Sequence, residues 1–203
     1  MYHSEHGQDR WLEENIFKGK SNGVFVEFGA LDGLLFSNTL FFEREHDWDG
    51  VLIEANLQSF HNLLASGRRA SQMWRGAVGP ERGIAEFIEV DAVTGWSGLS
   101  EHMDDRHRER IDQIGGTIRK YEVRVFPLAH ILRTCRLHHI DYMSIDVEGA
   151  EFPILSVFDF AAFDIDIIEV ENNYGSPAVE TLMSANGYRK IHTLEINDIY
   201  QRA

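Results

Sequence analysis

The sequence predicts an α/β fold built on a mainly parallel β-sheet, and three observations support that prediction. At least five apolar runs of strand length alternate with helical patterns, which implies parallel strands joined by right-handed crossovers. A glycine-rich turn at residues 29–33 directly follows the first of these strands. Four strands end in acidic residues, although acids are uncommon in strands. Because parallel strands direct their carboxyl ends towards a ligand crevice, these acids predict a binding site at that edge of the sheet.

The N-terminal half begins with a helical pattern and then alternates strands and helices. Residues 24–28 are apolar except for Glu27, as expected for a buried strand. Ser37, Asn38 and Thr39 can cap a helix that starts after the glycine-rich turn. Residues 84–90 alternate apolar and polar, which predicts a hairpin strand beside the third strand. The expected helices are 4–17, 36–46 and 56–65, and the expected strands are 24–28, 50–54, 73–78 and 84–90.

The C-terminal half contains two further buried strands, each followed by a helix. Pro127 favours a helix start and Gly187 a helix end. With no internal repeat, low-complexity tract or linker, residues 1–203 are expected to form a single domain with an N-terminal helix within 1–18. The expected elements are a loop at 94–100, helices at 101–114, 128–135, 154–158 and 178–186, strands at 121–125, 140–145 and 165–170, and a closing antiparallel pair at 188–193 and 197–201.

Composition and charge restrict the classes of partner. The formal net charge of −14 argues against a nucleic-acid backbone or an anionic membrane surface as the main partner, since both would be repelled. Cys135 is the only cysteine, so a disulfide framework is excluded and a reducing cytosol is expected. No signal peptide or apolar run of about 18 residues is present, which predicts a soluble, cytoplasmic protein.

The residues around the first turn favour S-adenosylmethionine over a dinucleotide. The turn lacks the full G-x-G-x-x-G pattern, and a pyrophosphate would meet the acids Glu27 and Asp32, which disfavours an NAD-dependent oxidoreductase. S-adenosylmethionine carries no phosphate, and its sulfonium and ammonium groups suit carboxylates. Glu54 lies about twenty residues beyond the turn, at the end of the second strand, where a carboxylate can accept both hydroxyls of a ribose.

The chain resembles the FkbM family of S-adenosylmethionine-dependent methyltransferases. The resemblance implies the Rossmann-like, seven-stranded sheet of class I methyltransferases, mostly parallel with an antiparallel last strand. It also implies O-methylation of a hydroxyl on a sugar, glycan or secondary metabolite. Leu31 departs from the family, which often has Asn there. The stretches that carry the resemblance are residues 7–9, residues 26–33 with 37–39, residues 48–54, and residues 145–151 with the pattern D-x-E-G-A-E.

The resemblance also implies a set of cofactor-binding residues. Glu27, Gly29, Ala30 and Asp32 are expected to line the methionine part of the cofactor. Ser37 and Asn38 are expected to bind its carboxylate at the helix start. The remaining expected contacts are Glu54 and Ala55 with the ribose and adenine, Ala77 and Val78 near the adenine, and Asp146 beside the sulfonium.

Asp146 and Glu148 are the expected catalytic residues, and their roles are open. Asp146 can hold the methionine ammonium and the acceptor, or it can bind a divalent cation such as Mg²⁺ together with Glu171 and Asn172. That metal set resembles the magnesium site of catechol-type O-methyltransferases. Without a metal, Glu148 is the first candidate for the general base, although it could instead cap the following helix. The alternative bases are His102, His130, His139 and His192.

Two functions remain open from the sequence alone, and an NAD-dependent oxidoreductase is a less favoured third. The first is an O-methyltransferase acting on a small-molecule or glycan acceptor, with residues 94–116, including Trp96 and Ser97, as an acceptor lid. The second is a non-catalytic S-adenosylmethionine-binding module that belongs to a larger assembly. The small size of the chain also makes a homo-oligomer an open prediction, because a second subunit could supply acceptor contacts.

Overall fold

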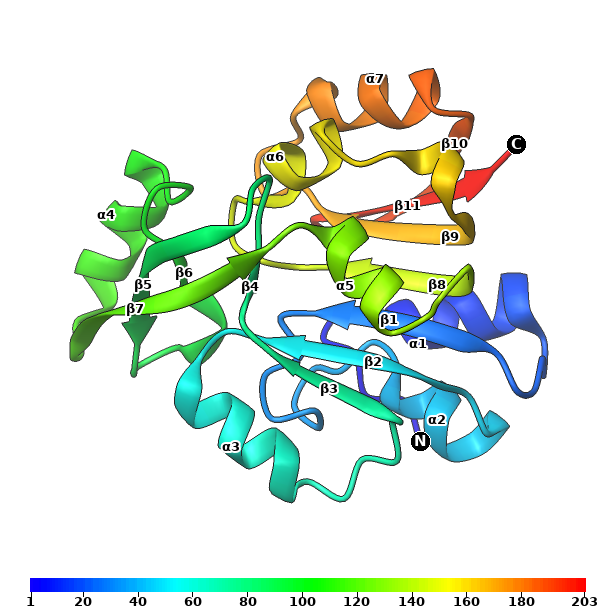
Figure 1. Cartoon of the computed structure of the whole chain (residues 1–203), viewed down its shortest axis with the longest axis horizontal. Coiled ribbons are helices and arrows are strands. Elements are labelled where there is room, and N and C mark those ends of the chain that lie inside the picture. Colours follow the sequence, from blue (N-terminus) through cyan, green and yellow to red (C-terminus); the bar gives the residue numbers. More distant parts are fainter.

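A computed structural model describes residues 1–203 and contains a large and a small β-sheet (Figure 1). The large sheet has seven strands in the order β10-β11-β9-β8-β1-β2-β3, and β11 alone runs antiparallel to its neighbours. This arrangement confirms the mostly parallel sheet with an antiparallel last strand. Its strands are β1 (Val24–Phe28), β2 (Asp49–Glu54), β3 (Gln72–Arg75), β8 (His139–Ile145), β9 (Asp164–Glu171), β10 (Tyr188–Leu194) and β11 (Asn197–Arg202).

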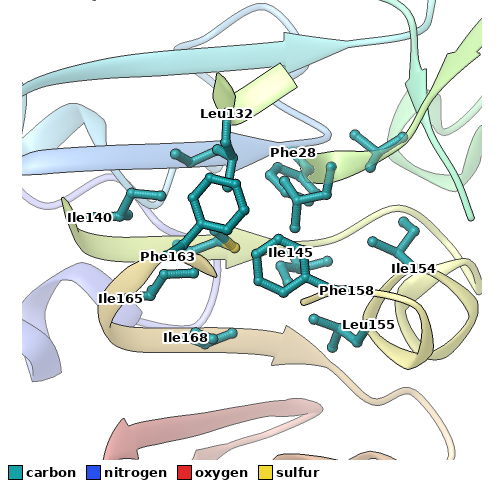
Figure 2. Packing of buried hydrophobic residues seen from close by; sticks show 14 of the residues in the cluster. Phe28, Leu132, Ile140, Ile145, Ile154, Leu155, Phe158, Phe163, Ile165 and Ile168 are labelled. Carbon is teal, nitrogen blue, oxygen red and sulfur yellow. The ribbon is translucent and has the colours of Figure 1, made fainter. Parts of the chain in front are cut away.

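Helices cover both faces of the large sheet, and each face has its own hydrophobic core. One core joins the sheet to α5, α6 and α7, and Figure 2 shows part of it, with Leu132, Phe163 and Ile145 among the packed side chains. The other core joins the opposite face to the N-terminal helix, α2 and α3. The helices are α1 (Gln8–Leu12), which continues as a π-helical turn at Glu13–Phe17, α2 (Leu40–His46), α3 (Leu57–Ala65), α4 (Asp105–Ile114), α5 (Leu128–Thr134), α6 (Glu151–Ser156) and α7 (Pro177–Ala185).

Alternation along the strands places the acidic side chains on one face of the large sheet. Val26 belongs to the core under α5 and α6, whereas Phe25 belongs to the core under α2, so Glu27 points to the α2 face. In the parallel register Glu27 lies opposite Ser144 of β8, and Ser144 lies opposite Glu169 of β9. The sheet therefore carries a row of polar side chains on the α2 face, close to its carboxyl edge.

The small sheet is an insertion between β3 and α5, and it corrects two expectations. The expected strand at 73–78 is divided at Gly76 into β3 of the large sheet and β4 of the small one. The strand expected at 84–90 pairs antiparallel with β7 in the small sheet and is not paired with β3. Gly76 permits the division because its φ is 152° and a Cβ there would lie 2.9 Å from Phe126. The strands are β4 (Ala77–Val78), β5 (Gly83–Val90), β6 (Gly98–Leu99) and β7 (Ile118–Phe126).

Three helices begin four residues later than their sequence patterns predict, because polar side chains hold the preceding residues in other conformations. One of them is α4, which begins at Asp105, after Asp104 accepts a hydrogen bond from the His107 amide at 2.7 Å. The first helix begins at Gln8, and Ser4 instead forms a β-bridge with Phe36 while its hydroxyl donates to Asp9 at 2.6 Å. The second begins at Leu40, after the capping sequence. Single 3-10 turns occur at Thr94–Trp96 and Phe160–Ala162. None of the helices combines the length and apolar character needed to cross a membrane.

Candidate active site

Two adjoining cavities lie at the carboxyl ends of the central parallel strands. The wide cavity has a volume of about 610 Å³, which is in the range of small-molecule sites, and the narrow cavity has a volume of about 70 Å³. Both are lined by Gly29, Leu31 and Asp146, so they meet where the first turn faces the end of β8. The site is therefore a two-part crevice at the edge of the sheet where the acids were expected.

The turn after β1 is shaped by contacts within the protein. A Cβ at Gly29 would lie 2.0 Å from the backbone oxygen of Asp146, and the φ of Gly29 is 69°. Glycine at this position thus allows the ends of β1 and β8 to touch. Gly33 serves packing in the same way, because a Cβ there would lie 2.4 Å from Leu63. The two glycines bring Asp146 to the turn, and they do not by themselves identify a ligand.

The narrow cavity has mostly apolar walls, and the acids Glu54, Asp146 and Glu148 also line it. Ala55, Ala77 and Val78, which were expected near an adenine, all line it. Glu54 lies at its edge and is 4% exposed. The other apolar side chains of its wall are Phe28, Leu31, Ile53, Phe87, Leu99, Val147 and Ala150. A flat apolar group can enter this cavity with its polar edge towards Glu54.

Glu54 links the first turn to the end of β2. One carboxylate oxygen accepts a hydrogen bond from the Leu31 amide at 2.8 Å, and the other accepts from the Asn56 amide at 2.5 Å. Burial raises the pKa of Glu54 to about 7, although these backbone hydrogen bonds favour the ionised form. Each oxygen keeps a lone pair, so the carboxylate can still accept hydrogen bonds from two hydroxyl groups.

The wide cavity is strongly acidic and is formed by segments from the whole chain. The N-terminal arm contributes Glu5 and His6, the loop before α4 contributes Trp96, and α4 contributes Arg110. Arg110 lies over the Trp96 ring, 4.2 Å from its centroid. The expected lid at 94–116 therefore supplies part of the cavity wall. The acids that line this cavity are Glu5, Glu27, Asp146, Glu148, Glu171 and Glu195.

Glu27 is bound by donors from the protein. Its carboxylate accepts hydrogen bonds from the Ser37 hydroxyl at 2.9 Å, the Asn38 amide at 2.7 Å and the Thr39 hydroxyl at 2.6 Å. Arg68 lies 3.7 Å away and also donates to Ser37. Glu27 thus anchors the segment before α2. Ser37 and Asn38 line the wide cavity. The Ser37 hydroxyl and the Asn38 backbone amide donate to Glu27, so these two groups are not free for a ligand carboxylate.

Glu169 is the second acid with partners in the protein. It is 1% exposed and accepts a hydrogen bond from the Tyr142 hydroxyl at 2.6 Å. The Asn38 side chain donates to Ser144 at 2.9 Å and reaches Glu169 at 3.4 Å. Burial raises the pKa of Glu169 to about 8. With Glu27, these residues form a hydrogen-bonded polar layer, in which the Asn38 side-chain oxygen is buried without a partner.

Asp146, Glu148 and Glu171 form a second group of acids, whose one ion-pair contact is between His107 and Glu148. Each contributes a carboxylate oxygen, and the three oxygens lie within 4.8 Å of one another. Burial raises the pKa of Asp146 to about 7, and burial together with the charge of Asp146 raises the pKa of Glu148 and of Glu171 well above the usual range. The Oε2 atoms of Glu148 and Glu171 are buried and have no hydrogen-bond partner.

Glu151, and not Glu148, accepts hydrogen bonds from the free backbone amides at the start of α6. Its carboxylate accepts hydrogen bonds from the Val147 amide at 3.0 Å and from the Gly149 amide at 3.0 Å. Glu148 instead has a φ of 58° and its side chain lines the wide cavity. Glu148 therefore does not cap α6, and it belongs to the acidic cluster instead.

Two expected site residues, Asn172 and Asp32, do not line the wide cavity. The Asn172 side chain donates to Asp198 at 3.0 Å and accepts from the Ser176 amide at 2.8 Å, so its amide is used at the start of α7. It lines a cavity of about 230 Å³ that Glu148 and Glu171 also line, but its side-chain amide is bonded to Asp198 and Ser176. Asp32 accepts hydrogen bonds from the amides of Leu34 and Leu35, at 2.9 and 2.8 Å, and lines neither cavity of the crevice.

His107 is a site-adjacent residue that the sequence did not indicate. Its Nδ1 lies 3.3 Å from Glu148 Oε2, and its Nε2 lies 2.9 Å from the carbonyl oxygen of Trp96. It is 4% exposed and shares the buried side of α4 with Ile111, four residues later. The four-residue spacing of His107 and Ile111 was the sequence signal that could have placed His107 on the buried side of the helix. The four histidines considered as bases do not line the wide cavity; they are His102, His130, His139 and His192.

Comparisons with known proteins give one family and several similar structures. A solved structure of the methyltransferase FkbM from Methylobacillus flagellatus KT is 13% identical, with a TM-score of 0.52, over 89% of this chain and 43% of the other. A SAM dependent methyltransferase from Aquifex aeolicus is 9% identical, with a TM-score of 0.43, over 96% and 88%. Phosphoethanolamine N-methyltransferase 1 of Haemonchus contortus, solved with phosphoethanolamine and S-adenosylhomocysteine, is 8% identical, with a TM-score of 0.41, over 98% and 40%.

The first of these structures supports the fold, and this chain spans less than half of that longer relative. Curated proteins give no match. The family model of the methyltransferase FkbM domain matches residues 27–190, which include the first turn, Glu54 and the acidic cluster. The chain therefore belongs to the FkbM methyltransferase family.

Proposed function

We propose that this protein transfers a methyl group from S-adenosylmethionine to a hydroxyl of a sugar, glycan or other small metabolite. The observation that carries the proposal is the two-part crevice, in which an apolar slot that contains Glu54 adjoins an acid-lined chamber at Gly29, Leu31 and Asp146. This division matches the donor, which has a flat adenine, a ribose and a cationic end. Family membership supports methyl transfer as the reaction class.

The residues of the crevice fit S-adenosylmethionine in a definite order. Val78 and the other walls of the narrow cavity suit the adenine, and the lone pairs left on Glu54 suit the ribose diol. Gly29, Ala30 and Asp146, at the junction with the wide cavity, suit the sulfonium and the methionine part. The acids of the wide cavity would disfavour a pyrophosphate there, so the oxidoreductase alternative is weaker.

When bound, S-adenosylmethionine supplies a methyl group whose bond to sulfur breaks as its bond to the acceptor oxygen forms. The acceptor hydroxyl must lose its proton in the same process. Asp146 and Glu148 are the nearest groups that can take it, since both line the wide cavity beside the first turn. Burial raises the pKa of Asp146 to about 7, so this carboxyl can hold and release a proton near neutral pH.

The wide cavity suits a hydroxylated acceptor. Trp96 offers an aromatic face in the wall, and the surrounding carboxylates are hydrogen-bond acceptors for hydroxyl groups. Its volume of about 610 Å³ leaves space for an acceptor beside the methionine part of the donor. A sugar or a polyhydroxylated metabolite fits these features better than an acceptor with a negative charge.

Two measurements test this proposal. Calorimetric titration with S-adenosylhomocysteine and, separately, with NAD should show saturable binding of the first only. Transfer of a labelled methyl group to a panel of glycosides should then give an O-methylated product. Tight binding of NAD, or binding of neither compound, would contradict the cofactor assignment. Binding of S-adenosylhomocysteine without transfer to any hydroxylated acceptor would favour the non-catalytic binding module.

The divalent cation expected from the sequence needs a different set of ligands. Asn172 is used at the start of α7, whereas Glu148 lies beside Asp146 and Glu171. A cation at this position would help to acidify the acceptor hydroxyl.

A further inference from the structure

We propose that Asp146, Glu148 and Glu171 form a binding site for one divalent cation with oxygen ligands, such as Mg²⁺, Mn²⁺ or Ca²⁺. The site differs from the sequence-based set because Glu148 takes the place of Asn172. Binding of the ion can be measured without any methyl donor. The role of the ion in activating the acceptor hydroxyl rests on the proposed methyltransferase function.

The spacing of the cluster fits a single ion. The three carboxylate oxygens lie within 4.8 Å of one another. Two ligands on opposite sides of Ca²⁺ are roughly 4.6–5.2 Å apart, and across Mg²⁺ they are roughly 4.0–4.2 Å apart. Small side-chain rotations would therefore bring the three carboxylate oxygens to bonding distance of one ion. Asp146 lines the wide cavity, which leaves the remaining ligand positions open to water or an acceptor hydroxyl.

An unpartnered buried oxygen gives independent support. Glu171 is 7% exposed, and its Oε2 is buried without a hydrogen-bond partner. A buried carboxylate oxygen without a partner costs about 1–3 kcal/mol or more, so native proteins rarely retain one without a ligand. Glu148 Oε2 also lacks a hydrogen bond, with only the His107 ring 3.3 Å away. A cation bound between these carboxylates would offset the burial of both acids.

No lysine or arginine neutralises the cluster. No ion pair within 4.0 Å joins a lysine or arginine to Asp146, Glu148 or Glu171. Arg110 is the one lysine or arginine in the cavity wall, and its guanidinium lies over Trp96. Two like charges at 4.8 Å repel by roughly 3 kcal/mol at an effective dielectric constant of about 20, so a divalent counter-ion is strongly favoured. Hard oxygen donors select Mg²⁺, Mn²⁺ or Ca²⁺ over metals that prefer nitrogen or sulfur.

The test uses Mn²⁺ alone as the probe, with the full chain after treatment with EDTA and buffer exchange. Free Mn²⁺ is followed by its electron paramagnetic resonance signal during titration, and Mg²⁺ is then added as a competitor. We expect one saturable site, and we expect Glu171→Gln and Glu148→Gln each to weaken its affinity about tenfold or more. Both substitutions keep the side-chain size, and a thermal melt checks that each variant is folded.

Two controls separate this site from other acids. Glu195→Gln changes an acid of the same cavity outside the cluster, and Asp164→Asn changes the exposed group formed by His139, Asp164 and Asp166. Neither control should change the Mn²⁺ affinity by more than about twofold. No saturable binding at millimolar Mn²⁺, or equal binding by wild type and Glu171→Gln, would overturn the proposal.

The same samples separate this proposal from the proposed function. If S-adenosylhomocysteine binds and methyl transfer continues unchanged in EDTA, while Mn²⁺ does not bind, the cation site is refuted and the methyltransferase proposal stands. If Mn²⁺ binds at the cluster but neither S-adenosylhomocysteine binding nor methyl transfer is found, the cation site stands and the methyltransferase proposal fails.

Discussion

Acids lie at both ends of the large sheet, and the cluster of Asp146, Glu148 and Glu171 at the carboxyl end lacks the partners that the acids of the amino end have. At the amino end, Asp141 is bonded to the Lys20 ammonium and to the Val24 amide at 2.6 Å, and Asp164 is bonded to Arg202 and to His139 at 3.0 Å. At the carboxyl end, the cluster around Asp146 has no such partner. Acid content alone therefore does not distinguish a structural end from a functional end.

The pKa values of the acids are also shifted in opposite directions, as Asp141 and Asp146 show. Burial by itself would raise the pKa of Asp141, but hydrogen bonds from Lys20, the Val24 amide and His139 outweigh it and lower the pKa. At the other end, burial raises the pKa of Asp146 to about 7, and no cation opposes the rise. An acid whose charge is satisfied by the protein stabilises the fold. An acid that the protein leaves unsatisfied is available to a ligand, at a cost in stability.

The largest expected effect comes from Asp146→Asn. It should lower the rate of methyl transfer by about 10²–10⁴, because it removes a proton acceptor beside the first turn. The free energy of unfolding should stay the same or increase, since a repelling charge is lost. Single-turnover assays with labelled donor, alongside urea unfolding, measure both. Asp164→Asn, at the opposite end of the sheet, is the activity control; an active Asp146→Asn enzyme would make that acid merely structural.

Glu54→Gln should act mainly on cofactor binding. We expect the affinity for S-adenosylhomocysteine to fall by about 1.5–3 kcal/mol, which is roughly 10- to 150-fold, because a charged acceptor for the ribose is lost. Gln keeps the side-chain length and one oxygen for the Leu31 amide, so the turn should persist. Calorimetry on this variant and on the exposed control Glu81→Gln makes the measurement. Equal affinities would put the ribose elsewhere.

Two substitutions, one at each end of the sheet, test this comparison through the free energy of unfolding. Asp141→Asn should lower the free energy of unfolding at pH 7 by about 1.5–3 kcal/mol, because it breaks charged hydrogen bonds that are buried. Glu171→Gln should raise it by about 1–3 kcal/mol in EDTA, because it removes an unpartnered buried carboxylate. Urea unfolding of both variants supplies the values. If both lost stability equally, the two ends of the sheet would not differ as described.

Cofactor binding should also depend on pH through Glu54. The folded pKa of Glu54, about 7, lies above its usual value of 4.5, so the stability that this group contributes is present below pH 4.5 and is lost as the pH rises through 7. Ribose hydroxyls favour the ionised form, so the affinity for S-adenosylhomocysteine should fall about tenfold between pH 8 and pH 6. Calorimetry across this range tests it. Glu54→Gln should flatten the profile, and an equally steep profile in that variant would assign the dependence to another group.

The smallest effect is expected for Asp164→Asn. Its partners are exposed, and exposed ion pairs are weakened by solvent. Its melting temperature should differ from that of the wild type by much less than that of Asp141→Asn. A fall in melting temperature as large as that of Asp141→Asn would show that solvent exposure does not explain the difference between the two acids.

The framework of the fold could be predicted because its signals are local. The buried strands of the large sheet are apolar runs, and Asn56 caps α3 as its position indicates. The strand at residues 73–78 was not predicted to divide, because Gly76 permits a change of sheet that depends on Phe126, fifty residues later. Helix α6 begins at Glu151, ahead of its apolar residues, because that side chain bonds to the preceding amides.

The location of the site could be predicted, but the use of each acid could not. Acids at parallel strand ends meet at one edge, and this placed Glu54, Asp146 and Glu171 together. Whether an acid is satisfied depends on partners far along the chain. Glu27 is held by the segment before α2 and has Arg68 nearby, whereas Glu148 has only His107. No local pattern distinguishes these cases.

The most direct test of the account is a crystal structure of the protein grown with S-adenosylhomocysteine. The account predicts adenine against Val78 in the narrow cavity, the ribose on Glu54, and the sulfur beside Asp146 at the mouth of the wide cavity. A cofactor product bound away from this edge of the sheet, with the acidic cluster facing only solvent, would contradict it.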